Sequence, residues 1–274
     1  MAVIIPPENW QRQPIVPLRL KQEHPLADGL IDYGYILPSG IPYSVFSELG
    51  NARPTLNSAA SVGQATSLGM GIDLPGSPHY IALNRHISAP TQVASGIWRG
   101  RVNSLSSFGI FFTTSYDVGS NFRGHFFQYG SNGSIEGHWG DNGGTSDSNR
   151  RSAISAGSVI SVSEDLSAAF VCRAATDWSL YKNGVSTGTP SYVGSASTYS
   201  PGNSWATVNF RSPSSYGNQT TTFWAYWSRA LDDGEMRALH DAPFQVLHPI
   251  RRRIWVSGAA VSPPGLLLMT GVGS

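Results

Sequence analysis

The sequence predicts an all-β protein, an antiparallel sandwich with one short helix near its C-terminus. Short apolar runs that alternate like strands recur between about residues 40 and 245, and clusters of Gly, Asn and Ser separate them. Charged residues make up 13% of the chain, while it holds 30 Gly and 18 Pro. Typical soluble domains have about 25% charged residues. Frequent turns between short strands, with few charges, are typical of β-sandwiches.

The strand candidates follow one another at short intervals through this region. They are residues 79–83, 96–102, 108–112, 125–129, 134–139, 159–162, 168–172, 178–181, 205–210 and 222–228. Asn183-Gly184 stands between two strand-like runs, and Asn-Gly is a strong signal for a tight hairpin turn.

A single helix is predicted directly after the last strand. Asp232 can cap its first turn, and Glu235, three residues later, completes a capping box. Met236 and Leu239 supply a short apolar stripe, and Pro243 marks the end.

Two of these segments resemble motifs of a known family. Arg229-Ala230-Leu231 followed by Glu235 is similar to the closing helix of laminin-G-like, concanavalin-A-like jelly rolls. The run 180–184, Leu-Tyr-Lys-Asn-Gly, resembles the Leu-Tyr-x-Asn-Gly hairpin of that family. The resemblance covers roughly residues 80–243, and it implies that the sandwich is a concanavalin-A-like jelly roll.

Both ends of the chain resemble laminin-G-like proteins of tailed bacteriophages. The resemblance rests on Trp10-Gln-Arg-Gln-Pro14, on residues 24–30, and on Arg251-Arg252-Arg253-Ile254-Trp255-Val256. It implies an extended N-terminal arm over 1–30, a jelly-roll body over 31–245 and a C-terminal extension over 246–274. We expect the two ends to bind neighbouring subunits. The predicted interface residues are Trp10, Arg251, Arg252, Arg253, Trp255 and Leu267.

Charge and cysteine content exclude several classes of partner. The net charge is +1, so no strong field attracts nucleic acid or an acidic membrane surface. Cys172 is the single cysteine, which rules out an internal disulfide and predicts a buried, inert thiol. No apolar run approaches eighteen residues, and no signal peptide is expected. We therefore predict neither nucleic acid nor membrane as a partner.

Glycoside hydrolysis is the enzyme activity to consider on this fold. Retaining enzymes place two carboxylates about 5 Å apart, which alternate residues of one strand can provide. Glu136 instead has His138 at the partner position, and Glu164 and Asp165 are adjacent and would face opposite sides of a strand. The sequence therefore predicts a protein that is not an enzyme.

The segment 140–149 is rich in side-chain oxygens and has two interpretations. It could bind calcium, or it could be a solvated hairpin loop, because it lacks the regular spacing of a calcium loop. No cofactor is predicted apart from this optional calcium ion. Trp139, Asp141 and Asn142 form the predicted glycan contact, since sugars stack on aromatic rings and bond to amides and carboxylates.

These observations predict a structural protein of a tailed-phage virion, in the capsid, neck or tail. Its expected partners are other virion proteins and copies of itself. The first alternative is a carbohydrate-binding module for glycans of the host surface, and the second is a glycoside hydrolase of the same fold.

Overall fold

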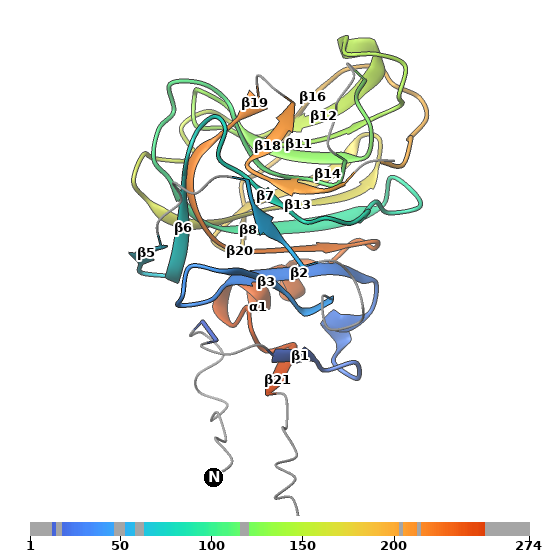
Figure 1. Cartoon of the computed structure of the whole chain (residues 1–274). Coiled ribbons are helices and arrows are strands. Elements are labelled where there is room, and N and C mark those ends of the chain that lie inside the picture. The colour runs from blue at the N-terminus through green and yellow to red at the C-terminus, as the bar shows by residue number, and fades with distance from the viewer. Residues whose placement is uncertain are drawn as a thin grey trace, which may run out of the picture.

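Two antiparallel sheets packed face to face form the body of the protein, as the sequence predicted (Figure 1). The computed structural model describes residues 13–14, 18–46, 53–57, 63–115, 121–202, 205–212 and 215–249. Every strand pair in these residues is antiparallel. No helix in this part of the chain has both the length and the apolar character needed to span a bilayer.

The eight-stranded sheet lies at the top of Figure 1. Its strands in spatial order are β16 (Ser191–Val193), β12 (Arg150–Ile154), β11 (Ile135–Gly140), β10 (His125–Tyr129), β9 (Gly109–Thr113), β17 (Thr207–Val208), β7 (Ile81–Ala82) and β4 (Thr55–Leu56).

The nine-stranded sheet lies beneath it and contains the longest strands. Its main order is β15 (Val185–Ser186), β14 (Asp177–Lys182), β13 (Asp165–Ala174), β8 (Ala94–Val102), β20 (Asn218–Trp227), β2 (Leu30–Ile36) and β3 (Pro42–Ser44). The remaining two strands are β6 (Gly69–Pro75), which pairs with β20, and β5 (Gly63–Thr66), which pairs with β6.

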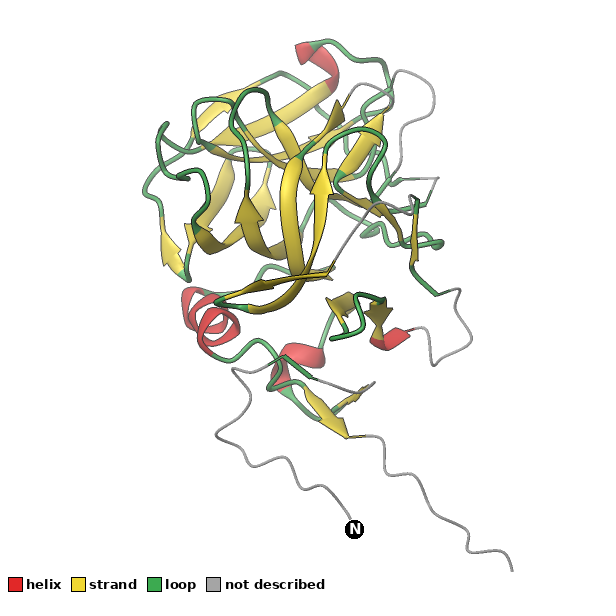
Figure 2. Cartoon of the chain, turned by 60° about the vertical axis from the view of Figure 1, so that its left-hand side comes forward, coloured by secondary structure: helices red, strands yellow, loops and turns green. Residues whose placement is uncertain are grey.

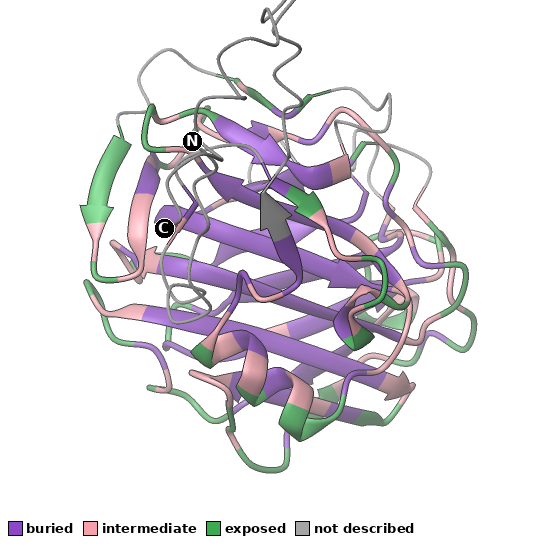
Figure 3. Cartoon of the chain, turned by 90° about the horizontal axis from the view of Figure 1, so that it is seen from below, coloured by how far each residue is buried: buried purple, intermediate pink, exposed green. Residues whose placement is uncertain are grey.

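A third layer covers the outer face of the nine-stranded sheet (Figures 1 and 2). It consists of helix α1 (Asp233–Asp241), the short 3-10 turn Pro25–Ala27 and a small sheet of β1 (Leu18–Leu20) and β21 (Leu247–Pro249). Figure 3 shows α1 lying across long strands that are mostly buried. The hairpin of β18 (Phe210–Ser212) and β19 (Ser215–Tyr216) and the 3-10 turn Asp147–Asn149 complete the described elements.

Each face of the nine-stranded sheet therefore has its own apolar core. Trp98 and Trp224 point between the two sheets and contribute to the main core. Phe223 and Trp227 point the other way, toward Met236 and Leu239 of α1. Because successive strand residues face opposite sides, β20 is buried along almost its whole length.

The described parts of the predicted arm (1–30) and of the predicted C-terminal extension (246–274) lie in this third layer. Leu18 of β1 pairs with Pro249 of β21, and Leu18 and Leu26 are buried in the second core. The backbone of Leu18 also bonds to two tyrosine hydroxyls of the body, those of Tyr35 and Tyr43, each at 3.1 Å. The physical reason is that the sheet's outer face is aromatic and must be covered. Residues 18–30 and 246–249 thus pack on their own domain.

The predicted interface residues at the two ends lie outside the described residues. These are Trp10, Arg251, Arg252, Arg253, Trp255 and Leu267. Their binding to neighbouring subunits stays a prediction.

Most predicted strands are confirmed, with two exceptions. Residues 159–162 form turns rather than a strand, because Ser158 and Ser163 adopt left-handed backbone angles on either side. The predicted strand 205–210 is broken at Asn209, which has a φ of 69° and separates β17 from β18. The predicted hairpin is confirmed: Asn183 and Gly184 both have positive φ, as a two-residue turn between β14 and β15 requires.

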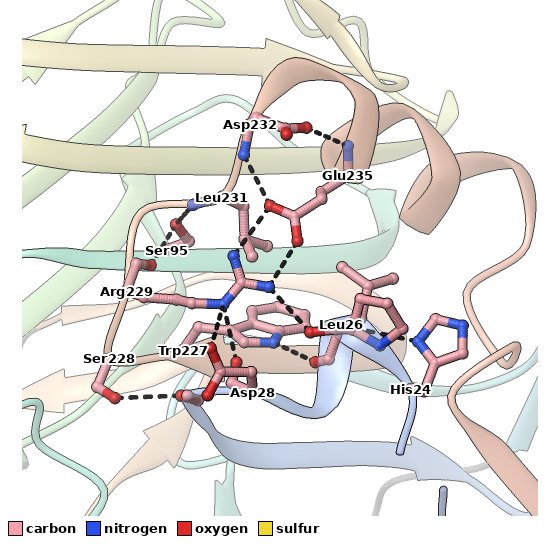
Figure 4. Close-up of polar contacts among 12 residues, drawn as sticks. His24, Leu26, Asp28, Ser95, Trp227, Ser228, Arg229, Leu231, Asp232 and Glu235 are labelled. Carbon is pink, nitrogen blue, oxygen red and sulfur yellow. Dashed lines mark hydrogen bonds and ion pairs between the residues drawn. The ribbon is translucent and has the colours of Figure 1, made fainter. Parts of the chain in front are cut away.

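The predicted capping box of α1 is confirmed, and Arg229 extends it (Figure 4). The Asp232 carboxylate accepts from the Glu235 backbone at 2.7 Å, and Glu235 accepts from the Asp232 backbone at 2.9 Å. The Arg229 guanidinium donates to both Glu235 oxygens and to the carbonyls of Asp28 and Pro25. One side chain therefore joins the end of β20, the start of α1 and the N-terminal turn.

We expect Arg229→Lys to lower the free energy of unfolding by about 1–2 kcal/mol, because an ammonium cannot reproduce the two-pronged guanidinium contact. Urea denaturation followed by circular dichroism measures this change. Arg237→Lys is the matched control, since Arg237 pairs with Asp241 on the solvent side of α1. That control should change stability by less than about 0.5 kcal/mol. Equal effects of the two substitutions would contradict the role assigned to Arg229.

Candidate functional site

The predicted glycan contact begins with Trp139, and the structure places this residue in the main core. Trp139 is 0% exposed and packs near Tyr199, with ring centroids 6.1 Å apart. Alternation along β11 explains this, because Ile135 and Trp139 face inward while Glu136 and His138 face outward. The Trp139 ring is therefore not available for stacking on a sugar, which corrects that part of the prediction.

Asp141 and Asn142 lie in the loop that follows β11, and their side chains are bonded within the protein. Asp141 accepts from the backbone of Gly143 at 2.7 Å. Asn142, which has a φ of 70°, accepts from the side chains of Asn121 and Arg123. These bonds fix the shape of an exposed loop. Among the described residues, no three His, Cys, Asp or Glu side chains gather as a metal site would require. A glycan contact by Asp141 and Asn142 stays a prediction.

Glu136 belongs to a polar network on the outer face of the eight-stranded sheet. Its carboxylate accepts from Gln128 at 2.7 Å and from Ser134 at 2.9 Å, and it lies 3.2 Å from Nε2 of His138. Nδ1 of His138 lies 2.6 Å from Oγ of Ser152 on the next strand.

The network keeps Glu136 ionised. Burial alone raises the pKa of Glu136, but hydrogen bonds from His138, Gln128 and Ser134 and attraction to His138 outweigh it and lower the pKa to about 2. A general acid in glycoside hydrolysis needs a raised pKa instead.

The other two carboxylates considered in the sequence are held elsewhere. Glu164 pairs with Lys182 at 2.7 Å, and Asp165 pairs with Arg101 at 2.7 Å on the nine-stranded sheet. The structure does not bring them to Glu136.

Another part of the outer face of the eight-stranded sheet, away from the Glu136 network, presents an exposed tryptophan. Trp205 is 54% exposed and lies two residues before β17, whose neighbours are β9 and β7. Ala206 and Val208 point into the main core, so Trp205 and Thr207 point to the opposite side of the segment. There Trp205 is exposed, whereas Thr207 is covered. Backbone bonds of Ala206 with Leu83 and Arg85, at 2.9 and 3.0 Å, hold the segment beside the chain that continues from β7.

The same alternation extends across β7 and β4, toward the edge of the sheet. Ile81 and Leu83 face the core, which leaves the residues between and beside them on the outer face. Thr55 of β4 pairs with Ala82 of β7, which sets the register of this edge. We call this surface the outer patch; it comprises Arg53, Thr55, Asn57, Tyr80, Ala82, Asn84 and Trp205.

Hydrogen bonds fix the polar groups of the outer patch. The Asn84 amide donates to the Arg53 carbonyl at 2.8 Å and to the Thr55 hydroxyl at 3.0 Å. The Asn57 amide donates to the Pro78 carbonyl at 3.3 Å. Arg53, Thr55 and Asn57 are exposed at the edge of the sheet. The patch thus presents an aromatic ring beside oriented amides and hydroxyls, which is the chemistry that binds sugars.

Sequence reasoning missed the outer patch for a physical reason. The sequence pattern predicts one continuous strand over 205–210, in which a tryptophan is usually part of the core, and it gives no sign of the break at Asn209. The strands β4, β7 and β17 have only two residues each, which is too short for an alternation pattern. Residues 53–57, 80–84 and 205–207 meet only through the fold.

Comparison with known proteins gives a fold but no family. No family model and no curated protein matches the sequence. Among solved structures, a Trypanosoma rangeli sialidase is similar with a TM-score of 0.53 and 12% identity, over 79% of this chain and 33% of the sialidase. The receptor binding domain of botulinum neurotoxin D is similar with a TM-score of 0.55 and 13% identity, over 79% of this chain and 53% of that chain.

A third similar structure is the receptor binding domain of the botulinum neurotoxin C/D mosaic serotype. Its TM-score is 0.56 at 14% identity, over 78% of this chain and 51% of that chain. The chain thus spans about a third to a half of the length of these proteins. At such low identity the likeness shows the fold alone: a lectin-like, jelly-roll β-sandwich.

Proposed function

We propose that this chain is a non-enzymatic carbohydrate-binding module whose outer patch holds a glycan. The main support for the proposal is the exposure of Trp205, a large aromatic side chain that is more than half exposed. An exposed indole offers a flat apolar face on which a sugar ring can stack. The amides and hydroxyls around it match the edges of a sugar, and the ring matches its apolar face.

The similar structures give this proposal further support. One of the sialidase structures is a complex with sialic acid, and the toxin domains are named as receptor-binding domains. A lectin-like sandwich with an exposed aromatic platform is a suitable scaffold for binding sugars on a host surface. Fold likeness adds plausibility only, because function depends on the site.

The test is a glycan array probed with the full chain, followed by calorimetry on the glycans that bind. We expect Trp205→Ala to weaken binding at least about tenfold, since an aromatic side chain that becomes buried under the ligand contributes a large share of the binding energy. Val185→Ala is the control, because Val185 is also exposed, at 56%, but lies on β15 of the other sheet. An array without any bound glycan, or one that Trp205→Ala leaves unchanged, would refute the proposal.

We further propose that the module belongs to a tailed-phage virion, where it contacts other virion proteins and copies of itself. This proposal depends on the sequence resemblance. The Leu180–Gly184 hairpin and the helix after Arg229 belong to the general laminin-G-like resemblance, and the likeness to phage proteins lies at the two ends of the chain. Mass spectrometry of purified particles from a host that carries the gene tests it. Absence of the chain from the particles would argue against the virion.

A further inference from the structure

The outer patch has an aromatic group at each end. Trp205 lies beside the chain that continues from β7 toward Asn84 and Arg85. Tyr80 directly precedes the other end of β7 and stacks on Phe210 at 4.6 Å, and Phe210 in turn contacts Tyr216 at 4.7 Å. Tyr80 and Tyr216 are half-buried. The patch is therefore bounded by a single exposed ring at one end and by a three-ring stack at the other.

The two ends are separated by a distance that the strand geometry sets. Tyr80 and Asn84 are four positions apart, which corresponds to about 13 Å in an extended strand. Ala82 lies midway between them, and Thr55 of β4 pairs with it on the side of the sheet edge. Thr207 of β17 pairs with Ala82 on the other side, but it is buried and its hydroxyl donates to the carbonyl of Phe210. The middle of the patch is therefore formed by two small side chains, Ala82 and Thr55, between the two aromatic groups.

We infer that the ligand of the outer patch is a linear oligosaccharide of several sugar units that lies along β7 and β4, not a single terminal sugar. This inference rests on the proposed function. A single pyranose ring is too short to reach from Trp205 to Tyr80, so it would leave one aromatic group unused. A chain can stack one unit on Trp205, cross the small residues and reach the Tyr80 end, while Asn57 and Asn84 line its path.

The first test uses the unchanged full chain and the array glycan with the strongest signal. Its dissociation constant is measured by calorimetry and compared with those of its own truncated forms, down to the terminal monosaccharide. We expect affinity to fall at least about a hundredfold from the full glycan to the monosaccharide, because contacts at the far end are lost. Equal affinity for both would overturn the inference and leave the proposed function standing.

The second test asks whether the two ends act on different parts of the ligand. Trp205→Ala should weaken the full glycan and its truncated forms alike. Asn57→Ala and Tyr80→Ala should weaken only the full glycan, bringing its affinity toward that of the truncated forms. Asn57 is exposed, so its variant keeps the test valid if Tyr80→Ala does not fold. Full binding of the long glycan by both variants would contradict the inference.

The two proposals fail in different ways. If no glycan binds on the array, the proposed function falls and the inference falls with it. If glycans bind and Trp205→Ala abolishes binding but length has no effect, only the inference falls. Val185→Ala should leave every one of these affinities unchanged.

Discussion

Replacing Asp32 by Ala is expected to lower the free energy of unfolding by about 3–5 kcal/mol, because it leaves a buried cation without its partner. Asp32 is 0% exposed and pairs with Arg85, whose side chain is 12% exposed. Its carboxylate also accepts from Ser44 at 2.8 Å and from Trp224 at 2.8 Å. The substitution therefore removes the acceptor of three buried donors at once, and each orphaned donor adds to the cost.

The pair is important because it joins the two sheets. Asp32 and Trp224 belong to β2 and β20 of the nine-stranded sheet, and Arg85 follows β7 of the eight-stranded sheet. Arg85 also donates to the carbonyl of Ile31 at 2.8 Å and lies over the ring of Phe46 at 4.8 Å. We expect the pair to fix the distance between the sheets beside the outer patch.

Urea denaturation followed by tryptophan fluorescence measures the loss. Asp177→Ala is the matched control, because Asp177 is 60% exposed and pairs with Arg173 at 3.6 Å. It should change stability by less than about 1 kcal/mol. Adding Arg85→Met to Asp32→Ala should restore part of the loss, since the unpaired cation is then gone. A loss below 1 kcal/mol for Asp32→Ala would show that the pair contributes little.

Local signals made much of the fold predictable. The capping box of Asp232 and Glu235 and the turn at Asn183-Gly184 depend on residues within four positions of one another. Their chemistry is therefore visible in the sequence, and both form as predicted. The long strands β13 and β20 were visible for a related reason, since runs of alternating or continuous apolar residues have few other interpretations.

The third layer could not be predicted in the same way. The prolines between Pro14 and Pro25 predict extended backbone; Leu18–Leu20 is a strand, whereas Pro25 begins a 3-10 turn. Extended backbone can cover its own domain or a neighbour. What decides is the outer face of the nine-stranded sheet, where Tyr33, Phe223 and Trp227 need a cover. That face exists only once β2, β8, β13 and β20 are paired, so the sequence did not show that residues 18–30 and β21 would cover it.

The candidate site shows the same limit more strongly. Trp139 and Trp205 both occur in strand-like sequence, yet one is 0% and the other 54% exposed. The difference depends on which side of the strand faces the core. Which side a given residue takes is set by pairing partners that are distant in the chain. Aromatic residues can therefore be recognised as candidates from sequence, but their exposure has to come from the fold.

His125 lies at the centre of the main core and makes two hydrogen bonds that fix its neutral form. Its Nε2 lies 3.0 Å from the carbonyl of Gln92, so Nε2 carries the proton, and Nδ1 accepts from the hydroxyl of Tyr226 at 2.8 Å. Phe170 stacks on the ring with centroids 5.8 Å apart. Complete burial lowers the pKa of His125 to about 3, and the bond to Gln92 only partly offsets this.

Acid is therefore expected to destabilise the fold through His125. Its pKa is lower in the folded state than in the unfolded chain, where it is 6.5, so protons bind the unfolded state preferentially. Stability from this group is complete above pH 6.5 and is lost as pH falls toward 3, at about 1.4 kcal/mol per pH unit. Between pH 7 and 5 the lowered pKa of Glu136 adds little, because that carboxylate titrates further into acid.

We expect His125 alone to lower the free energy of unfolding by roughly 2 kcal/mol between pH 7 and pH 5, and the lowered pKa values of His24 and His240 act in the same direction. His125→Gln removes the titrating ring. It should reduce the slope of the unfolding free energy against pH by about 1.4 kcal/mol per pH unit, the contribution of one proton, whatever its effect on stability at pH 7. Tyr226→Phe is the informative control: it removes the hydroxyl bonded to Nδ1 and lowers stability, but it keeps the imidazole and therefore the slope. Urea denaturation at half-unit pH steps separates the two. If His125→Gln and Tyr226→Phe have equal slopes, His125 is not the acid-sensitive group, and the loss of stability between pH 7 and 5 has to come from the other histidines whose pKa burial lowers, His24 and His240.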